Sequence, residues 1–326
     1  MHILTCTDIG IKYFEGSVVT IGNFDGVHRG HAELFRNLKE RADLLGLPSV
    51  VVTFEPHPLS VLAPEAAPPL ITTFDQKAEL IAATGIDCLV VIEFNLEFSL
   101  RSADSFVRDV LCHSLGMRHI IIGHDYAFGR DRQGNYETLS QLGIECGFTL
   151  EDLDPVGEGA TIYSSSLARR LIASGDLSAA SQVLGRYHAI SGTVIHGRDI
   201  GHILGFPTAN IMTRNELIPV DGVYAVMVSI AGELFQGACN IGSNPTFAGT
   251  GRSIEVFLLD FSRQLYGVEI TLFFVQRLRD ERRFPDAGTL VQAIGQDVSA
   301  ARTILSAARR EMIMLPTQEL ITRSKT

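Results

Sequence analysis

The stretch Val18-Val19-Thr20-Ile21-Gly22-Asn23-Phe24-Asp25-Gly26-Val27-His28-Arg29-Gly30-His31 decides how this chain is built. A short apolar run ends at Gly22, a turn punctuated by glycine follows, and an amphipathic segment then spans residues 32–45. This order predicts a strand, a tight turn and a helix. Gly26 and Gly30 let the backbone turn sharply and approach a ligand. Because a helix start presents unpaired N–H groups and a positive dipole end, the turn is predicted to bind phosphate.

Two histidines mark the entrance of this helix. The three-residue spacing of His28 and His31 places both imidazoles on one side of the helix. Such a pair can donate hydrogen bonds to the charge that develops on a phosphate during a transfer reaction. A zinc site would need a cysteine or acidic partner at ligand spacing, which this stretch lacks. A capped helix with incidental histidines is the plainer alternative, and neither a Walker loop nor a dinucleotide fingerprint is present.

Composition limits the classes of protein to consider. At 326 residues the chain is expected to form two domains, and its 46% hydrophobic content is ample for packed cores. A net charge of −10 argues against non-specific nucleic-acid binding. No uninterrupted apolar run reaches the ~18 residues that cross a bilayer. The five cysteines are scattered without close pairs, which favours reduced thiols and a cytoplasmic location.

The first half alternates β-type and helical segments, which predicts an α/β fold with a doubly wound parallel sheet. Apolar runs at 48–54, 88–92 and 119–123 are read as strands, and segments 74–84 and 102–116 as helices. Ligands of such sheets bind beyond the carboxyl ends of the strands. The residues that follow expected strand ends are Gly22, His57, Phe94 and Asp125.

The second half changes to short β-type runs broken by glycine, so we place the domain boundary between residues 184 and 185. Domains 1–184 and 185–326 follow from this. Successive strands at this spacing predict a small antiparallel β-barrel. A helix at 290–310 has one apolar face and is expected to cap the barrel. No regular structure is expected from Pro316 on. The strand-like runs are 188–194, 222–230, 234–241, 253–260 and 268–278.

Two further segments carry polar groups suited to phosphate. Tyr163-Ser164-Ser165-Ser166-Leu167-Ala168-Arg169-Arg170 opens a helix, where hydroxyls ordinarily act as N-caps. Gly201-His202-Ile203-Leu204-Gly205-Phe206-Pro207-Thr208-Ala209-Asn210 combines a glycine-rich loop with oxygen ligands of the kind that Mg²⁺ prefers. Gly197 precedes this loop. Glu255 falls on an otherwise apolar run, where a carboxylate is costly without a task or a partner.

These motifs resemble those of the bacterial bifunctional riboflavin kinase/FAD synthetase family, in the family's order, from about residue 18 to 302. The stretch 22–31 is similar to the His-x-Gly-His signature of nucleotidylyltransferases. The segment 163–170 resembles the second signature, Ser-Ser-Thr-x-x-Arg, with Ser166 in the threonine place. The block 201–210 resembles the riboflavin kinase signature. Two positions depart from many relatives: His202 replaces a basic residue, and Phe257 replaces a histidine.

The resemblance assigns roles residue by residue. It implies His28, His31, Arg169 and Glu255 as catalytic residues, Glu255 being the general base of the kinase. It implies that ATP for adenylyl transfer is bound by Gly22, Asn23, Phe24, Gly30, Ser164, Ser165 and Ser166. Flavin is expected to be bound by Phe54, His57, Asp125, Arg279 and Arg282. ATP for the kinase is expected at Gly197, Gly201, Gly205 and Pro207, with Mg²⁺ on Thr208 and Asn210. Arg170 is a second candidate for the phosphate role of Arg169.

The implied reactions are the phosphorylation of riboflavin by ATP, giving FMN, and the transfer of AMP from a second ATP to FMN, giving FAD and pyrophosphate. The expected partners are therefore riboflavin, FMN, FAD and ATP with Mg²⁺ as cofactor, without nucleic acid or membrane; a weak homo-oligomer stays open. An alternative is a nucleotidyltransferase for another phosphate acceptor, with the barrel as a binding module. A second alternative is a flavin-binding or sensing protein with only one of the two activities or neither. A bound flavin chromophore without turnover of ATP would favour this alternative.

Overall fold

The computed structural model describes residues 1–6, 11–123, 128–130, 133–197, 205–243, 252–314 and 321–324. The chain divides into two compact units that are not continuous in sequence. The first unit comprises Met1–Pro69, Phe74–Ser165 and Thr317–Thr326; the second comprises Leu70–Thr73 and Ser166–Pro316. Each unit is described by itself.

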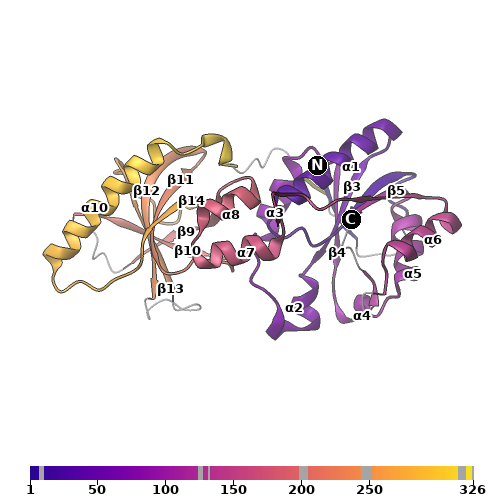
Figure 1. Cartoon of the computed structure of the whole chain (residues 1–326), viewed down its shortest axis with the longest axis horizontal. Coiled ribbons are helices and arrows are strands. Elements are labelled where there is room, and N and C mark those ends of the chain that lie inside the picture. Colours follow the sequence, from indigo (N-terminus) through magenta and orange to yellow (C-terminus); the bar gives the residue numbers. More distant parts are fainter. Residues whose placement is uncertain are drawn as a thin grey trace. The chain divides into compact units, whose positions relative to one another are not determined.

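The first unit is built on a parallel sheet flanked by helices (Figure 1). Within the described residues this sheet has seven strands in the order β15-β1-β4-β3-β2-β5-β6. Its central strands are short and almost wholly buried because helices cover both faces. The strands are β1 His2–Cys6, β2 Ser17–Ile21, β3 Ser49–Glu55, β4 Cys88–Glu93, β5 Met117–Gly123, β6 Thr149–Leu153 and β15 Thr322–Ser324.

Alternate residues of each strand pack against different helices, which confirms the doubly wound prediction. Val18 and Val51 join a core with Leu34 and Phe35 of helix α1 (Arg29–Leu45) and with helix α3 (Phe74–Ala82). Their neighbours point to the other face, where a second core forms. Its helical side comes from the π-helical segment η2 (Phe106–Ser114), which continues α5 (Ala103–Ser105), and from α6 (Tyr136–Cys146).

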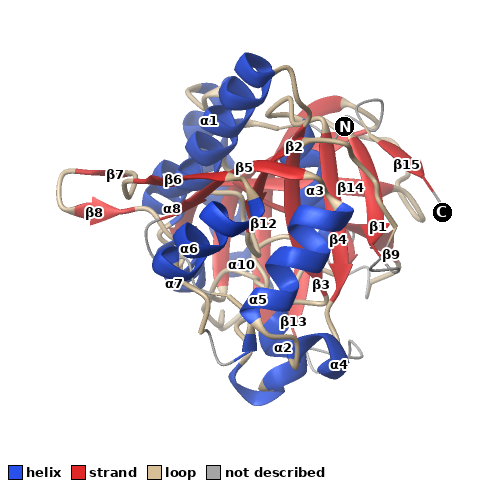
Figure 2. Cartoon of the chain, turned by 90° about the vertical axis from the view of Figure 1, so that its right-hand side faces the viewer, coloured by secondary structure: helices blue, strands red, loops and turns tan. Residues whose placement is uncertain are grey.

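Short elements complete the first unit at its surface. Strands β7 (Gly157–Glu158) and β8 (Thr161–Ile162) form a two-stranded antiparallel ribbon that projects from the elements around it (Figure 2). Beyond the carboxyl ends of β3 and β4 lie α2 (Pro58–Leu62), the 3₁₀ segment η1 (Pro64–Ala66) and α4 (Leu96–Ser99).

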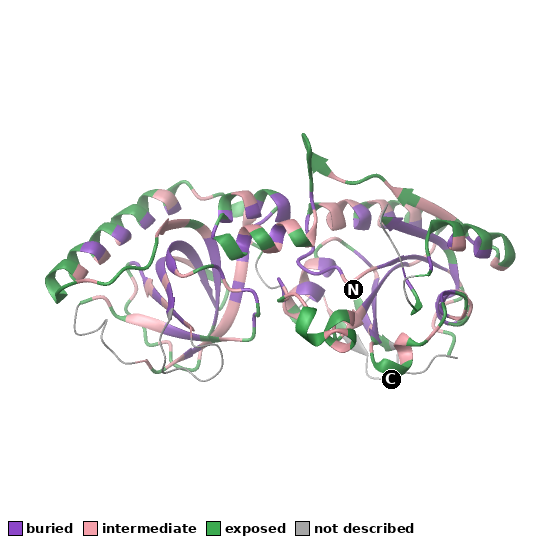
Figure 3. Cartoon of the chain, turned by 60° about the horizontal axis from the view of Figure 1, so that its bottom comes forward, coloured by how far each residue is buried: buried purple, intermediate pink, exposed green. Residues whose placement is uncertain are grey.

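The second unit contains a closed antiparallel barrel in the order β10-β13-β12-β11-β14-β9, as predicted from the second half of the chain. Each of its strands contains buried residues, and the strands carry purple stretches in Figure 3. Helix α10 (Ala287–Ser306) packs on β11, β12 and β14 through Ala301 and Leu305. The remaining elements of this unit are α7 Ser165–Ser174, α8 Leu177–Leu184, β9 His188–Ile195, β10 Thr208–Thr213, β11 Gly222–Ile230, β12 Glu233–Ser243, β13 Arg252–Leu258, β14 Glu269–Arg279 and η4 Arg310–Met312.

Strands β1 and β6 and helix α6 were not predicted from the sequence, and three further differences have physical reasons. Strand β10, expected as part of a loop, exists because it closes the barrel between β9 and β13. The tail, for which no element was expected, was wrongly predicted: β15 pairs in parallel with β1 at the sheet edge. Helix α1 begins at Arg29, three residues before the amphipathic segment, because the side chain of His28 caps it.

Candidate active sites

The turn after β2 lies where the order of the first sheet reverses. Strand β2 pairs with β3 on one side and β5 on the other, so the chain leaves β2 in one direction and later returns to its opposite flank. In open parallel sheets such a reversal leaves a crevice beyond the carboxyl ends of the strands, where ligands bind. Residues 22–28 connect β2 to α1 at this place.

His28 is the N-cap of α1 and thereby acquires a defined tautomer. Its Nδ1 accepts a hydrogen bond from the Gly30 backbone N at 3.1 Å. A neutral imidazole with Nδ1 as acceptor carries its proton on Nε2, so this atom is a donor. The ring of His31 stacks on that of His28, with centroids 3.7 Å apart and planes at 26°. The structure therefore brings the two predicted histidines together at a helix start.

The backbone of this turn is held in an unusual conformation. Phe24 and Val27 have positive φ angles of 50° and 37°, which side-chain-bearing residues rarely adopt. The ring of Phe24 meets that of His31 edge-on at 5.1 Å and fills the space beside Gly22. At Gly30 a Cβ would stand 3.0 Å from the His28 ring. Strain of this kind persists where the surroundings over-determine the backbone, and it concentrates at functional sites.

The second signature contacts the turn through its first residues. Ser165 Oγ donates to the Asp25 carbonyl oxygen at 2.8 Å. Tyr163 is buried, accepts from Arg29 at 2.9 Å and lies under that guanidinium. Ser164 is half-buried. Ser166 is exposed and Arg169 half-buried, and both belong to α7 in the second compact unit.

The predicted flavin-side residues of the first unit lie at the ends of β3 and β4. Phe54, Phe94 and Phe98 form a cluster with ring centroids between 5.8 and 6.2 Å apart. His57 caps α2 through Nδ1, and its Nε2 lies 3.2 Å from the Asn23 side-chain amide. Two residues expected to bind different substrates are thus in direct contact. Asp125 lies outside the described residues.

Lys77 also lies at this rim and was not predicted from the sequence as a site residue. It is buried on α3, and its Nζ donates to the Asn23 carbonyl oxygen at 3.3 Å and to Thr53 Oγ1 at 3.2 Å. Burial lowers the pKa of its ammonium, and the carboxylates of Glu55 and Asp25 oppose that shift. The signal was available: Lys77 falls four residues before Ile81 on the apolar face of a helix, where a charge needs a reason.

In the barrel, strand register gathers the predicted kinase residues on one face. Asn210 of β10 lies directly opposite Glu255 of β13, which in turn lies opposite Asn240 of β12. Thr208 is two residues from Asn210, on the same face, and its Oγ1 donates to Glu255 Oε2 at 3.4 Å. On either side of Glu255 along β13, Ile254 and Val256 point into the buried interior. Glu255 is half-buried rather than fully buried, because its face of β13 points away from the interior.

The glycine loop is described only at its two ends. Gly197 lies against Asn210, and a Cβ added at Gly197 would stand 2.0 Å from the amide nitrogen. Gly205 has a φ of 83° with open space around it, and Pro207 is exposed. Gly201 and His202 lie outside the described residues. Phe206 packs edge-on against Phe257 at 5.3 Å, so Phe257, where the resemblance led us to expect a histidine, has a packing role.

The two arginines expected on the flavin side of the barrel have intramolecular partners. Arg279 donates to both carboxylate oxygens of Asp297 on α10, at 2.7 to 3.1 Å. It also lies over the ring of Phe284, as does Arg282, with guanidinium-to-centroid distances of 5.6 and 5.0 Å. Arg279 therefore joins β14 to α10, and this pairing limits its freedom to reach a ligand.

The barrel face suits a hard cation better than a softer one. Thr208, Asn210 and Glu255 offer hydroxyl, amide and carboxylate oxygens, the donor types that Mg²⁺ prefers together with phosphate oxygens. In the part of the chain that the structure describes, no cluster of three or more His, Cys, Asp or Glu could hold a metal ion by itself. A cation at Thr208 and Asn210 would thus depend on its nucleotide for further ligands, which fits Mg²⁺.

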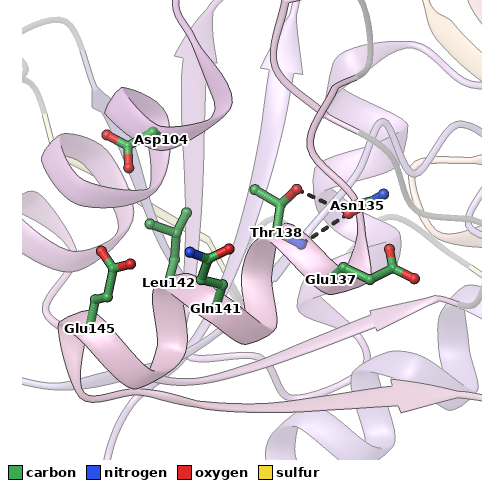
Figure 4. A pocket seen from close by; sticks show the side chains of 7 residues that line it. All are labelled: Asp104, Asn135, Glu137, Thr138, Gln141, Leu142 and Glu145. Carbon is green, nitrogen blue, oxygen red and sulfur yellow. Dashed lines mark hydrogen bonds between the residues drawn. The ribbon is translucent and has the colours of Figure 1, made fainter.

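A cavity of about 480 Å³ lies elsewhere in the first unit (Figure 4). It is lined by residues of α5 and α6, among them Asp104, Glu137 and Glu145. Asn135, also in its wall, is occupied as the N-cap of α6, accepting from Thr138 N at 3.0 Å. None of the residues predicted from the sequence lines it. Asp104 and Glu145 are each paired with Arg108, and the described residues that line this cavity include no basic side chain that could bind a nucleotide phosphate.

None of the helices in the described part of the chain combines the length and the apolar character that a membrane span needs.

Burial, and secondly the charge of Glu255, raises the pKa of the Cys239 thiol, so this cysteine beside the barrel face is held neutral.

Comparison with known proteins covers both halves. Residues 11–167 match the model of the FAD synthetase family, and residues 184–305 match that of the riboflavin kinase family. The bifunctional riboflavin kinase/FMN adenylyltransferase of Pseudomonas fluorescens is 42% identical over 290 residues, 89% of this chain and 93% of that protein. The protein of that name from Escherichia coli K12 is 39% identical over 289 residues, 88% and 92% of the two chains.

A solved structure adds a likeness in fold. A Streptococcus pneumoniae protein, described as a macrolide-efflux protein, superposes with a TM-score of 0.85 at 29% identity, covering 92% of this chain and 98% of that one. The curated relatives match at higher identity, over nearly their whole length, and in both halves. The chain therefore belongs to the bifunctional riboflavin kinase/FMN adenylyltransferase family.

Proposed function

We propose that this bifunctional enzyme makes FMN on the barrel face and FAD at the turn after β2, each reaction with its own residues. The observation that carries the proposal is that two chemically different groups of side chains fall in two separate units. Stacked histidines at a helix start belong to the first, and a carboxylate beside a hydroxyl and an amide belongs to the second. Residues 1–184 and 185–326 are the proposed functional domains.

In the kinase reaction Glu255 is proposed as the general base. The 5′-hydroxyl oxygen of riboflavin attacks the γ-phosphorus of ATP, its proton passes to the Glu255 carboxylate, and the bond to the bridging oxygen breaks to release ADP. The half-buried position of Glu255 supports this role, since the carboxylate is reachable and is held by Thr208. The loop containing Gly197, Gly201, Gly205 and Pro207 is proposed to cover the ATP phosphates.

Thr208 and Asn210 are proposed to hold the Mg²⁺ of the kinase. When bound, this ion would neutralise charge on the ATP phosphates. Asn210 is only 8% exposed and is opposed by Glu255 in register, so its amide can be held in one orientation. Arg282 is proposed to contribute to the flavin side of the barrel, and Arg279 to position that side through Asp297.

In the adenylyl transfer the phosphate of FMN is the nucleophile and attacks the α-phosphorus of ATP, releasing pyrophosphate. That phosphate is already ionised at neutral pH, so no protein base is needed. Catalysis then depends on positioning and on stabilising charge. His28 is proposed to donate from Nε2 to the reacting phosphate, with His31 beside it, and Arg169 to hold the leaving phosphates. The fork of an arginine suits phosphate oxygens.

The other residues predicted for adenylyl transfer are assigned to its two substrates. Gly22, Asn23, Phe24 and Gly30 are proposed to line ATP together with Ser164, Ser165 and Ser166. Phe54, His57 and Asp125 are proposed for the flavin, and the ring cluster beside Phe54 supports this because flavins stack on aromatic faces. A cytoplasmic location is proposed from the dependence on ATP and from the free thiols at Cys88, Cys112, Cys146 and Cys239.

The first experiment is chromatography of the products formed from riboflavin, ATP and Mg²⁺ by the purified chain. FMN followed by FAD is expected. Feeding FMN in place of riboflavin should give FAD without the first step. Formation of FMN alone would remove adenylyl transfer from the first unit, and bound flavin without turnover would restore the sensing alternative.

A further inference from the structure

Lys77 is a buried cation placed at the turn that carries the two histidines. Its side chain is 9% exposed, and its ammonium reaches the carbonyl oxygen of Asn23 at 3.3 Å, Thr53 Oγ1 at 3.2 Å and Glu55 Oε2 at 3.8 Å. Phe74 lies beneath the ammonium, 5.8 Å from its ring centroid. All of these polar contacts belong to the carboxyl-end rim of β2 and β3.

A purely structural role for Lys77 would be to fasten α3 to the sheet. Ala78, Ile81 and Ala82 already bury the same helix face. An apolar side chain would serve that purpose without removing a charge from water, which is expensive in a protein interior. The lysine therefore needs a reason that lies in the groups it contacts.

The contact with Asn23 acts on a strained backbone. The carbonyl of Asn23 immediately precedes Phe24, whose φ is 50°, and Val27 follows with a φ of 37°. Thr53 Oγ1 donates to the same carbonyl at 3.2 Å, so two side chains from outside the turn converge on one oxygen. Such convergence is the over-determination that a strained conformation requires.

The charge of Lys77 also matters for an anionic substrate. Asp25 is buried within the turn, and Glu55 ends β3; both carboxylates interact electrostatically with Lys77. Replacing the ammonium by a neutral group would remove one positive charge from this rim, which would weaken the attraction for the triphosphate of an incoming ATP. The lysine thus offsets negative charge at the place where phosphate has to be accepted.

We infer that Lys77 is a positioning residue for adenylyl transfer, which holds the Asn23 carbonyl and so keeps the histidine turn in its reacting conformation. The inference rests on the proposed use of this turn for making FAD. Lys77 acts through the backbone of the turn, and no contact with substrate is assigned to it.

The test compares Lys77→Met with Lys77→Arg in the full chain. Misplacement of reacting groups by about 1 Å lowers a rate by about 100-fold, so Lys77→Met is expected to lower kcat for FAD formation from FMN by about that factor. KM for ATP should rise as well, because a positive charge is lost from the rim that is proposed to accept the nucleotide. Lys77→Arg keeps the charge and should recover most of kcat. Riboflavin phosphorylation by the same samples should stay within about twofold.

Lys39→Met is the matched control. Lys39 lies on α1 in the same unit and pairs with Asp43 at 2.8 Å and Asp87 at 3.2 Å, contacts in which the histidine turn takes no part. It should leave both activities within about twofold. Equal effects of Lys77→Met and Lys39→Met would overturn the inference, as would a loss that arginine does not rescue.

Two further variants keep the outcome decisive. If Lys77→Met does not fold, Thr53→Val removes the other donor to the Asn23 carbonyl; FAD formation should then fall about tenfold with riboflavin phosphorylation unchanged. An unchanged rate in Thr53→Val would reject the inference. The variant with both His28→Ala and His31→Ala separates the two proposals. If this variant retains FAD formation, the proposed adenylyl-transfer site is rejected. If this variant loses FAD formation while the Lys77 and Thr53 variants retain it, only the positioning role of Lys77 is rejected.

Discussion

The turn after β2 and the outer face of β10 and β13 both gather groups for phosphate chemistry, but different parts of the chain do the positioning. At the turn, the backbone positions the groups. Positive φ angles at Phe24 and Val27 and the helix cap formed by His28 bring the ring centroids of the two histidines to 3.7 Å from each other. On the barrel face, strand register does it, since Glu255 and Asn210 are cross-strand partners in unstrained β structure.

This difference predicts how each site responds to change. A strained turn depends on the contacts that hold it, so substitutions at a distance through Asn23, as at Lys77, should alter it. A site set by register is protected from distant changes by the whole barrel, and it should fail mainly when its own side chains or their immediate space change. The following tests either separate the two sites or show that they are one.

The largest effect is expected from replacing both His28 and His31 by alanine. Loss of one transition-state donor lowers kcat by about 10²–10³, so FAD formation from FMN should fall by about 1,000-fold or more. Riboflavin phosphorylation should be unchanged, measured on the same preparation. His28→Asn is the control for the helix cap, because an asparagine side chain can accept from the Gly30 N–H but lacks the imidazole donor. Retained FAD formation in the double variant would remove the histidines from the mechanism.

Glu255→Gln should give the reverse pattern. A lost general base lowers turnover by about 100-fold or more, so FMN formation should fall by that factor while FMN adenylylation stays intact. Glu233→Gln, on neighbouring β12 and exposed beside Arg263, is the matched control and should be neutral. Equal loss of both activities in Glu255→Gln would mean that the sites are not separate.

A smaller effect is expected from Gly197→Ala. The added Cβ would stand 2.0 Å from the Asn210 amide, which must move from its place opposite Glu255. Kinase turnover should fall by about tenfold through misplacement, with FAD formation from FMN unaffected. Gly295→Ala, on an exposed turn of α10 with open space at its Cβ, should change neither rate. Normal kinase kinetics in Gly197→Ala would argue against a role for Asn210.

The least effect on activity at neutral pH is expected from replacing His188, a residue whose protonation affects the stability of the barrel. Burial lowers the pKa of His188 from 6.5 to about 4, and its Nε2 lies 3.2 Å from the Leu217 carbonyl oxygen. Below pH 6.5 the unfolded state binds a proton at this ring, whereas the folded state disfavours the protonated ring. The free energy of unfolding therefore decreases as the pH falls from 6.5 toward 4, by up to about 3 kcal/mol.

Thermal unfolding of the barrel at pH 7.5 and pH 4.5 measures this loss. His188→Gln keeps a donor for the Leu217 carbonyl and cannot titrate, so its melting temperature should fall less on acidification than that of the parent chain. Burial also lowers the pKa of His119 in the first unit. The parent chain and His188→Gln share that contribution, so the difference between their changes in melting temperature isolates the contribution of His188. Identical slopes would show that this ring does not control acid sensitivity.

Much of the fold followed from local pattern. Buried β-branched runs alternating with amphipathic helices predicted the doubly wound sheet, and regularly spaced strands predicted the barrel, because burial on one or both faces imposes its own periodicity. Strand β10 was missed because Gly205 and Pro207 read locally as a turn. Only barrel closure pairs Thr208–Thr213 with β9 and β13. Strand β15 was missed since three residues carry no usable pattern.

For the sites, the sequence by itself determined the residue types and their order: a histidine pair at a helix start, a hydroxyl and an amide two residues apart, and a carboxylate in an apolar run. Tertiary structure alone decided that Glu255 faces Asn210, that Arg279 is paired with Asp297, and that Lys77 reaches the Asn23 carbonyl 54 residues earlier in the chain. The physical reason is that local pattern reports which face of an element is buried. Partners across strands and between helix and turn are set by register and packing, which no short stretch contains.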